Sequence, residues 1–189
     1  NVIYHFNSKK YKQTQNKKYF CTFGNLHKAK DGLSILNAWD KSKMYKEYNF
    51  FFVGKIWKDS NTKMMFNYLN KQKHLKHSVF FTRFLNKKKF EFFLNNTKVA
   101  IQLRKFTRGE SSGTIVELLA RKKITIINNI DSLKEIPNNT TIKLKENYNI
   151  MDVVNGIKKS EKINYTLLKQ NIEKFLKKID IKIISKKFK

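Results

Sequence analysis

The feature that most constrains the fold of this chain is residues 99–137, where two apolar runs flank a turn of small residues and a short amphipathic segment. The first run spans 99–103, and the turn at 109–113 contains two glycines, two serines and a glutamate. Isoleucine and leucine then recur at helical spacing over 115–119, before a second apolar run at 124–127. Largely apolar runs are typical of strands buried on both faces, so this order predicts a parallel strand–helix–strand unit. In open sheets of that kind, ligands bind at the carboxyl ends of the strands.

The same alternation extends over the whole chain and predicts the α/β class, with a doubly wound, Rossmann-like parallel sheet. With 189 residues the chain suits one domain, which we place at 19–178, with a connecting segment at 1–18 and a basic tail at 179–189. We expect strands at 19–24, 50–53, 79–82, 99–103, 124–127 and 141–144, and helices from Gly32, over 62–73 and 87–94, from near Ser111, and over 149–158 and 164–178.

Two carboxylates mark the turn and the helix that follows it. Glu110 precedes the expected helix and Glu117 comes seven residues later, close to two helical turns on, so both lie on nearly the same side. Ser111, Ser112 and Gly113 offer small side chains and N–H groups at the helix N-terminus, whose partial positive charge suits a phosphate. The spacing alone is weak evidence, because eight glutamates give such a pair by chance, and a solvated helix face is the plain alternative for Glu117.

The sequence around these carboxylates resembles the retaining, family-four type of nucleotide-sugar-dependent glycosyltransferases, which have the GT-B fold. Those enzymes carry two glutamates at this spacing in their C-terminal donor domain. In a bacterial subset, an apolar strand ending in Leu-Arg leads to Gly-Glu-Ser/Thr-Ser-Gly, a helix, a strand and a Glu-Leu/Ile-Pro turn. This chain is similar to that pattern at Arg104, at residues 109–113 and at the turn that ends with Pro137, its only proline.

The resemblance implies a nucleoside-diphosphate sugar lying across the strand ends of a single GT-B half-domain. Glu110 would contact the transferred sugar, Glu117 would hold the ribose hydroxyls, and N–H groups at the helix start would bind the phosphates. Lys30 and Arg104 would neutralise the nucleoside diphosphate as it leaves, which is electrostatic stabilisation of a leaving group. The catalytic candidates are therefore Glu110, Lys30 and Arg104, and the donor-binding candidates are Glu117, Ser111, Ser112, Gly113, Thr114, Gly24, Asn25, Arg83 and Phe84.

The loop after the first expected strand departs from the family pattern. Family members have Gly-Arg-Leu and then Lys-Gly, whereas this chain has Gly-Asn-Leu from Gly24 and Lys-Asp-Gly from Lys30. Lys30 matches the family lysine, although one more solvated surface lysine is its plain alternative. Asn25 stands in place of the arginine, so Arg104 or Lys28 would supply the missing positive charge.

Two residues after the third expected strand lie where the family contacts the nucleobase. These are Arg83 and Phe84, within the sequence Thr-Arg-Phe. The plain alternatives are an exposed loop charge for Arg83 and a core position for Phe84.

The formal net charge of +27 attracts anions such as nucleotides, nucleic acid or acidic lipid headgroups. Only four of the 41 basic residues are arginine, the residue that reads base edges, which argues against a sequence-specific nucleic-acid protein. A solvated lysine-rich surface without a partner is the plain alternative, and an anionic membrane surface is the next candidate. A basic α/β module that binds RNA or another polyanion stays open as the alternative function.

No cofactor and no metal are expected. The four histidines form no ligand constellation with carboxylates or cysteines, and the chain lacks Asp-X-Asp, P-loop and Gly-X-Gly-X-X-Gly sequences. The single cysteine, Cys21, excludes an internal disulfide and lies in an apolar run, which fits a core residue in a reducing compartment. No apolar stretch reaches the length of a membrane span and no signal peptide is visible, so we expect a cytoplasmic protein, peripheral at the inner face of the membrane.

We therefore expect the donor domain of a metal-independent glycosyltransferase of surface polysaccharide synthesis, with a nucleotide sugar as substrate and a saccharide or lipid-linked acceptor. The family's N-terminal acceptor domain is expected to be missing from this chain, which alone would turn over little or nothing.

Overall fold

Short apolar segments form one parallel sheet in the computed structural model, which describes residues 19–107 and 112–179. In those residues the strand order is β3-β2-β1-β4-β5-β6, and it reverses between β1 and β4. Each half of the sheet therefore winds outward from its centre, which confirms the predicted doubly wound architecture. The strands are β1 (Tyr19–Phe23), β2 (Asn49–Val53), β3 (Val79–Arg83), β4 (Thr97–Gln102), β5 (Ile124–Asn128) and β6 (Ile142–Leu144).

Helices connect these strands, and most begin at a side chain that accepts a hydrogen bond from the first turn. Asp31, Asp59, Asn86 and Asn149 cap the helices that follow them in this way. The helices are α2 (Gly32–Ser42), α3 (Ser60–Lys71), α4 (Lys87–Asn96), α5 (Gly113–Ala120), α6 (Ile150–Lys162) and α7 (Tyr165–Ile179), with short 3-10 segments η1 (Met44–Lys46), η2 (Lys73–His77) and η3 (Asp131–Glu135).

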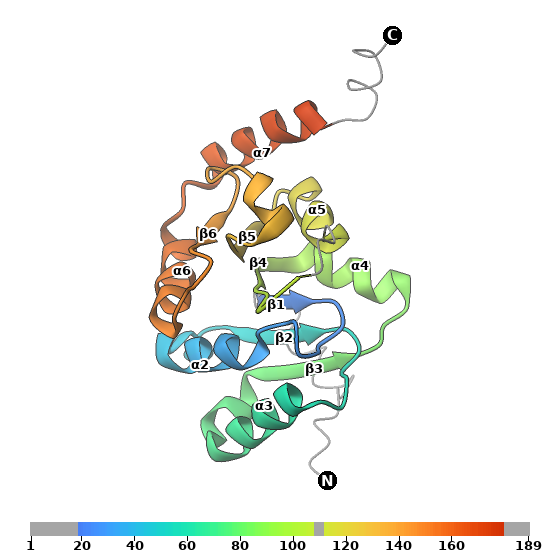
Figure 1. Ribbon diagram of the computed structural model, residues 1–189, viewed down its shortest axis with the longest axis vertical. Coiled ribbons are helices and arrows are strands. Elements are labelled where there is room, and N and C mark those ends of the chain that lie inside the picture. The colour runs from blue at the N-terminus through green and yellow to red at the C-terminus, as the bar shows by residue number, and fades with distance from the viewer. Residues whose placement is uncertain (1–18, 108–111, 180–189) are drawn as a thin grey trace.

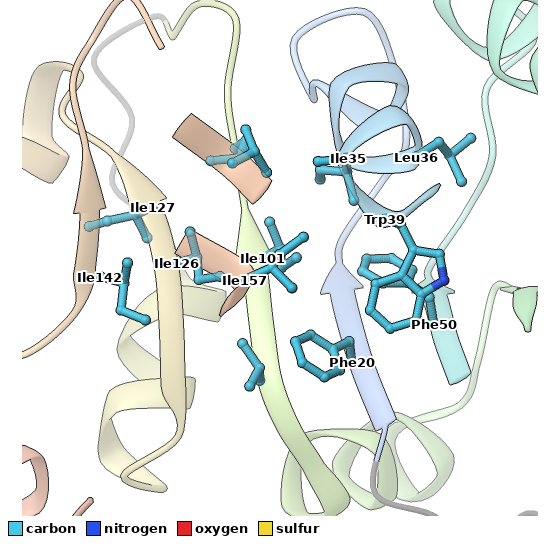
Figure 2. Packing of buried hydrophobic residues seen from close by; sticks show 14 of the residues in the cluster. Phe20, Ile35, Leu36, Trp39, Phe50, Ile101, Ile126, Ile127, Ile142 and Ile157 are labelled. Carbon is cyan, nitrogen blue, oxygen red and sulfur yellow. The ribbon is translucent and has the colours of Figure 1, made fainter. Parts of the chain in front are cut away.

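Side chains of β1 to β4 alternate between two hydrophobic cores, because successive residues point to opposite faces of a sheet. One core includes Phe20 and Phe50, and Trp39 of α2 packs against their rings at centroid distances of 5.1 and 5.2 Å (Figure 2). The helices α2, α3 and α6 contribute to this core. The other core includes Cys21 and Phe51 and is covered by residues of α4 and α5.

The two sets of helices lie on opposite sides of the sheet, with α2 and α6 on one side and α4 and α5 on the other (Figure 1). Cys21 is fully buried, and this burial raises the pKa of its thiol, as expected for the predicted core residue. Of the predicted flanking segments, 1–18 lies outside the described residues, and so does the tail except for Ile179, which ends α7.

Candidate functional site

The carboxyl ends of β1 and β4 form the centre of the candidate site, because the strand order reverses between them and a crevice opens there. Two glycines let the neighbouring loops come together. Gly24 has a φ of 95° and Gly54 a φ of 140°. Residues that carry a Cβ atom rarely adopt either conformation. A Cβ atom on Gly54 would lie 2.3 Å from the carbonyl oxygen of Gly24, so this close approach requires a glycine.

Lys30 lies in the loop after β1, and neutral groups hold its ammonium. Nζ donates hydrogen bonds to the carbonyl oxygen of Phe23 at 3.1 Å and to Oε1 of Gln102 at 3.0 Å. Burial, and then the positive charge of Arg104, lowers the pKa of Lys30 to about 8. No ion pair involves Lys30 within residues 19–107 and 112–179. An ammonium in these surroundings would be stabilised by an anion.

Arg104 follows β4 on the other side of the crevice and forms an antiparallel backbone bridge with Lys30. Its backbone is held on both sides by the side chain of Asn128, at the end of β5. The amide Oδ1 accepts a hydrogen bond from the Arg104 N–H at 3.0 Å, and Nδ2 donates one to the Arg104 carbonyl oxygen at 2.9 Å. The structure thus brings together two of the three predicted catalytic residues, and their roles stay predictions.

Two polar residues that position this pair escaped the sequence reasoning. Gln102 and Asn128 are each 1% exposed, and each is the last residue of its strand. Burial of an amide is costly unless the amide is hydrogen-bonded. A polar side chain at the end of a buried strand was therefore the feature of the sequence that could have identified these two residues.

Asp31, the residue inserted between Lys30 and Gly32, fastens the loop after β1. Its buried carboxylate accepts hydrogen bonds from the N–H of Ser34 at 3.4 Å and from the hydroxyl of Tyr148 at 2.7 Å. Burial, and then the negative charge of Asp31, raises the pKa of Tyr148. The insertion therefore joins the loop to the segment that precedes α6.

The start of α5 lies at the same edge of the sheet. The Ser112 carbonyl accepts the N–H of Ile115 at 2.9 Å, and Gly113 and Thr114 open the first turn, where helix amides have no partner within the helix. Gly113 is exposed, and a Cβ atom there would contact nothing within 4 Å. Glu110 and Ser111 lie outside the described residues, so their predicted roles are untested.

Glu117 lies one turn into α5 instead of the expected two, because Ser112 is the N-cap and the helix begins at Gly113. Its side chain is 55% exposed and pairs with Arg121 one turn further along the helix. The alternative interpretation of Glu117, a carboxylate on a solvated helix face, also predicts an exposed ion pair of this kind. Ribose binding by Glu117 stays a prediction.

The residues predicted near the nucleobase are both exposed. Arg83 ends β3 in a left-handed conformation, with a φ of 60°. The following side chain, Phe84, is 80% exposed, so the interpretation of Phe84 as a core residue is wrong. Asn25, which stands where the family has arginine, is exposed in the loop after β1.

A pocket of about 640 Å³ adjoins this edge of the sheet. Trp57, in the connection between β2 and α3, lines it and is 52% exposed. The sequence reasoning missed this tryptophan, although a large aromatic residue just beyond a buried strand and a glycine was a usable signal. The lining residues are Asn25, His27, Lys28, Ala29, Trp57, Asp59, Phe106 and Thr107.

Residues 19–107 and 112–179 contain neither a metal-binding cluster nor a membrane-spanning helix. No three His, Cys, Asp or Glu side chains in those ranges are placed to hold a metal ion together. No helix in the same ranges is both long enough and apolar enough to cross a membrane.

A protein-family model described as "Glycosyl transferases group 1" matches residues 4–179. No curated protein sequence matches the chain significantly. Among solved structures, the fold resembles the C-terminal domain of a glycosyl transferase group 1 family protein (LpcC) from Francisella tularensis, with a TM-score of 0.73, 13% identity and 93% of each chain covered.

Two longer proteins show the same fold over part of their length. Anabaena HepE, solved in complex with UDP and glucose, has a TM-score of 0.76 and 12% identity, with 96% of this chain and 49% of HepE covered. A glycosyltransferase from Rickettsia africae has a TM-score of 0.67 and 22% identity, with 87% of this chain and 43% of that chain covered. This chain therefore spans about half the length of these two proteins.

Proposed function

Because this chain belongs to the glycosyl transferases group 1 family, we propose that it is the domain that binds the nucleotide-sugar donor in a glycosyltransferase. The donor's diphosphate lies in the crevice between β1 and β4, bound by Lys30, Arg104 and the first N–H groups of α5. Glu117 holds the ribose, and Arg83 and Phe84 lie beside the nucleobase. Glu110 contacts the transferred sugar.

The observation that carries this proposal is the environment of Lys30. Its ammonium is held between two neutral acceptors, beside Arg104 and at the reversal point of the sheet. The positive charge of Arg104 disfavours the charged form of Lys30, and a bound diphosphate would offset this repulsion and stabilise the occupied site. Arg104, which follows β4, then supplies the positive charge that is missing because Asn25 stands where the family has an arginine.

This arrangement suits the departure of a nucleoside diphosphate. During transfer, the bond between the anomeric carbon and the diphosphate oxygen breaks, and its electron pair stays on that oxygen. The acceptor hydroxyl oxygen forms the new bond to the anomeric carbon, and its proton passes to the departing diphosphate. Lys30 and Arg104 stabilise the charge that develops on the leaving group, and neither has to move a proton. Retention of the anomeric configuration and independence from metal are part of the proposal.

The partners follow from the same proposal. The acceptor is a saccharide or lipid-linked saccharide of bacterial surface polysaccharide synthesis, and it docks on an N-terminal acceptor domain. The net charge of +27 favours contact with anionic headgroups at the cytoplasmic face of a membrane.

Nucleotide binding tests the proposal directly. The midpoint of thermal unfolding is measured with UDP, GDP and ADP, and with pyrophosphate as an anion control, at near-physiological salt. A ligand at about 100 times its dissociation constant stabilises the folded state by about 2.7 kcal/mol, enough for a shift of several degrees. We expect one nucleotide to give a larger shift than pyrophosphate does.

A matched pair of variants locates the site. Glu117→Ala should reduce this shift, whereas Glu173→Ala should not, although both remove an exposed carboxylate that pairs with a basic residue. Equal shifts with every anion that disappear as salt increases would instead support the polyanion-binding alternative. Unchanged nucleotide affinity in Glu117→Ala would refute the assignment of the ribose site.

A further inference from the structure

The pocket beside Trp57 is lined by residues other than those of the proposed nucleoside subsite. Arg83, Phe84 and Glu117 belong to the segments that lead into or form α4 and α5. The pocket is lined instead by residues of the connections that follow β1, β2 and β4. Its ligand is therefore a different part of the substrates from the nucleoside.

Backbone hydrogen bonds hold the walls of this pocket in place. Beyond the ends of β1 and β2, Leu26 donates to the carbonyl oxygen of Lys55 at 2.8 Å, and Trp57 donates to that of Leu26 at 2.9 Å. The hydroxyl of Thr62 donates to the Trp57 carbonyl oxygen at 2.6 Å. Trp57 is thus fixed on a backbone that continues the sheet, so the pocket is formed before a ligand arrives.

His27 and Asp59 supply hydrogen-bonding groups to the lining of the pocket. The His27 and Trp57 rings lie 5.9 Å apart, and Nδ1 of His27 accepts the Ala29 N–H at 3.3 Å. One carboxylate oxygen of Asp59 caps α3 by accepting the Thr62 N–H at 2.9 Å. The other carboxylate oxygen has no hydrogen bond or ion pair within residues 19–107 and 112–179, which leaves an acceptor for a ligand.

The charge of the lining distinguishes this pocket from the rest of the molecule. The chain carries a net charge of +27, yet the lining has one lysine, Lys28, and one carboxylate, Asp59. A binding site for phosphates or for a polyanion would carry an excess of cations and no unpaired carboxylate oxygen. A lining with balanced charge, exposed aromatic rings and hydrogen-bonding groups suits a neutral ligand that has both an apolar face and hydroxyl groups.

We propose that this pocket binds a neutral pyranose ring, stacked on the indole of Trp57 with its hydroxyl groups donating hydrogen bonds to Asp59. The proposal deepens the proposed function, since it places a saccharide of the reaction among the connections that follow β1, β2 and β4. The ring belongs either to the acceptor or to the transferred sugar, and both sources present the same chemistry to the pocket.

The two tryptophans of the chain allow a direct test. Trp39 is fully buried and Trp57 is 52% exposed, so a soluble quencher such as acrylamide reaches only Trp57 readily. In a Trp39→Phe variant, Trp57 is the only tryptophan, so tryptophan fluorescence reports on Trp57 alone. Millimolar glucose, galactose, mannose or N-acetylglucosamine, or one of their disaccharides, should lower the quenching constant about twofold, because a stacked ring covers the indole. A quenching constant that no sugar of this panel changes would overturn the proposal.

Variants at two positions separate stacking from a general loss of structure. Saturation-transfer NMR should show about tenfold weaker binding of the active sugar to Trp57→Ala, with much of the affinity retained by Trp57→Phe, which keeps an aromatic face. Asp59→Asn preserves the helix cap, because asparagine caps as well as aspartate, and should weaken binding about threefold. Equal binding by wild type and Trp57→Ala would place the sugar elsewhere and refute the proposal.

The same titrations show whether the ring belongs to the acceptor or to the donor. Binding of the sugar can be measured whether or not a nucleotide binds. Protection of Trp57 by a free sugar that persists with bound nucleotide assigns the ring to the acceptor. Displacement of that sugar by its nucleotide sugar, and not by the nucleotide, assigns the ring to the donor. If no nucleotide binds and a sugar still protects Trp57, the donor function fails and the saccharide pocket stands. Protection by UDP, GDP or ADP alone would overturn the pocket assignment.

Discussion

The affinity of the domain for a nucleoside diphosphate should fall above pH 8, and this expectation follows from Lys30. Burial lowers the pKa of Lys30 in the empty domain to about 8. A bound diphosphate favours the charged ammonium and raises that pKa, so binding takes up a proton wherever the empty site has lost one. The contribution of Lys30 to affinity is therefore nearly complete at pH 7, where most Lys30 is charged before binding, and it declines as the pH rises through 8.

The size of this effect follows from the fraction of charged Lys30. A group with a pKa of about 8 keeps its proton in about one tenth of the molecules at pH 9, so the dissociation constant should rise about tenfold between pH 7 and pH 9. Ordinary surface lysines titrate near 10.4 and stay charged over this range, which leaves the general positive field almost unchanged.

Isothermal titration calorimetry at constant ionic strength from pH 7 to pH 9 measures this dependence. Lys30→Arg is the control, because a guanidinium stays charged and should give a nearly flat profile. Lys30→Met should bind weakly at every pH, whereas Lys41→Met, a change at an exposed lysine of α2, should behave as the wild type. A flat wild-type profile, or an equal tenfold loss in Lys30→Arg, would refute the assignment of Lys30 to the diphosphate.

Two further predictions concern the loops that form the crevice. Gly54→Ala should destabilise the fold by about 3 kcal/mol in urea denaturation, because its Cβ meets the Gly24 carbonyl and its φ is 140°, whereas Gly113→Ala should be neutral or slightly stabilising. Similar stabilities for the two variants would contradict this. Tyr148→Phe should cost about 2 kcal/mol by the same measurement, since it removes the hydrogen bond to the buried carboxylate of Asp31, and a stability equal to wild type would show that the bond contributes little.

The sequence predicted the strands to within about two residues, because a parallel strand covered on both faces needs an apolar run and little else. The predicted strand at 50–53 became β2 (Asn49–Val53), and Gly54 ends it as expected. The 3-10 segments escaped prediction, since a single turn such as η3 has no periodicity to detect. The helix α5 begins at Gly113 and not near Ser111, because a run of small residues does not indicate which of them begins the helix.

The candidate site was predictable where it depends on chain position and unpredictable where it depends on tertiary contact. Lys30 and Arg104 each follow a strand, and parallel strands bring their carboxyl ends together, so their proximity follows from topology. The hydrogen bond from Lys30 to Gln102 joins residues 72 positions apart, and no local pattern announces it. Trp57 likewise lines a pocket only because the backbone beyond β2 pairs with that beyond β1.

The bond between Lys30 and Gln102 also bears on how the domain assembles. One partner belongs to the half of the sheet made by the first three strands, and the other to the half that begins with β4. A nascent chain that has emerged only as far as α4 contains only one side of the crevice. It therefore has no complete binding site, and a ligand cannot stabilise it. A diphosphate bound across this seam would hold the two halves together and slow their separation during unfolding. Hydrogen exchange at β1 and β4 should therefore report ligand occupancy more sensitively than exchange at the outer strands β3 and β6.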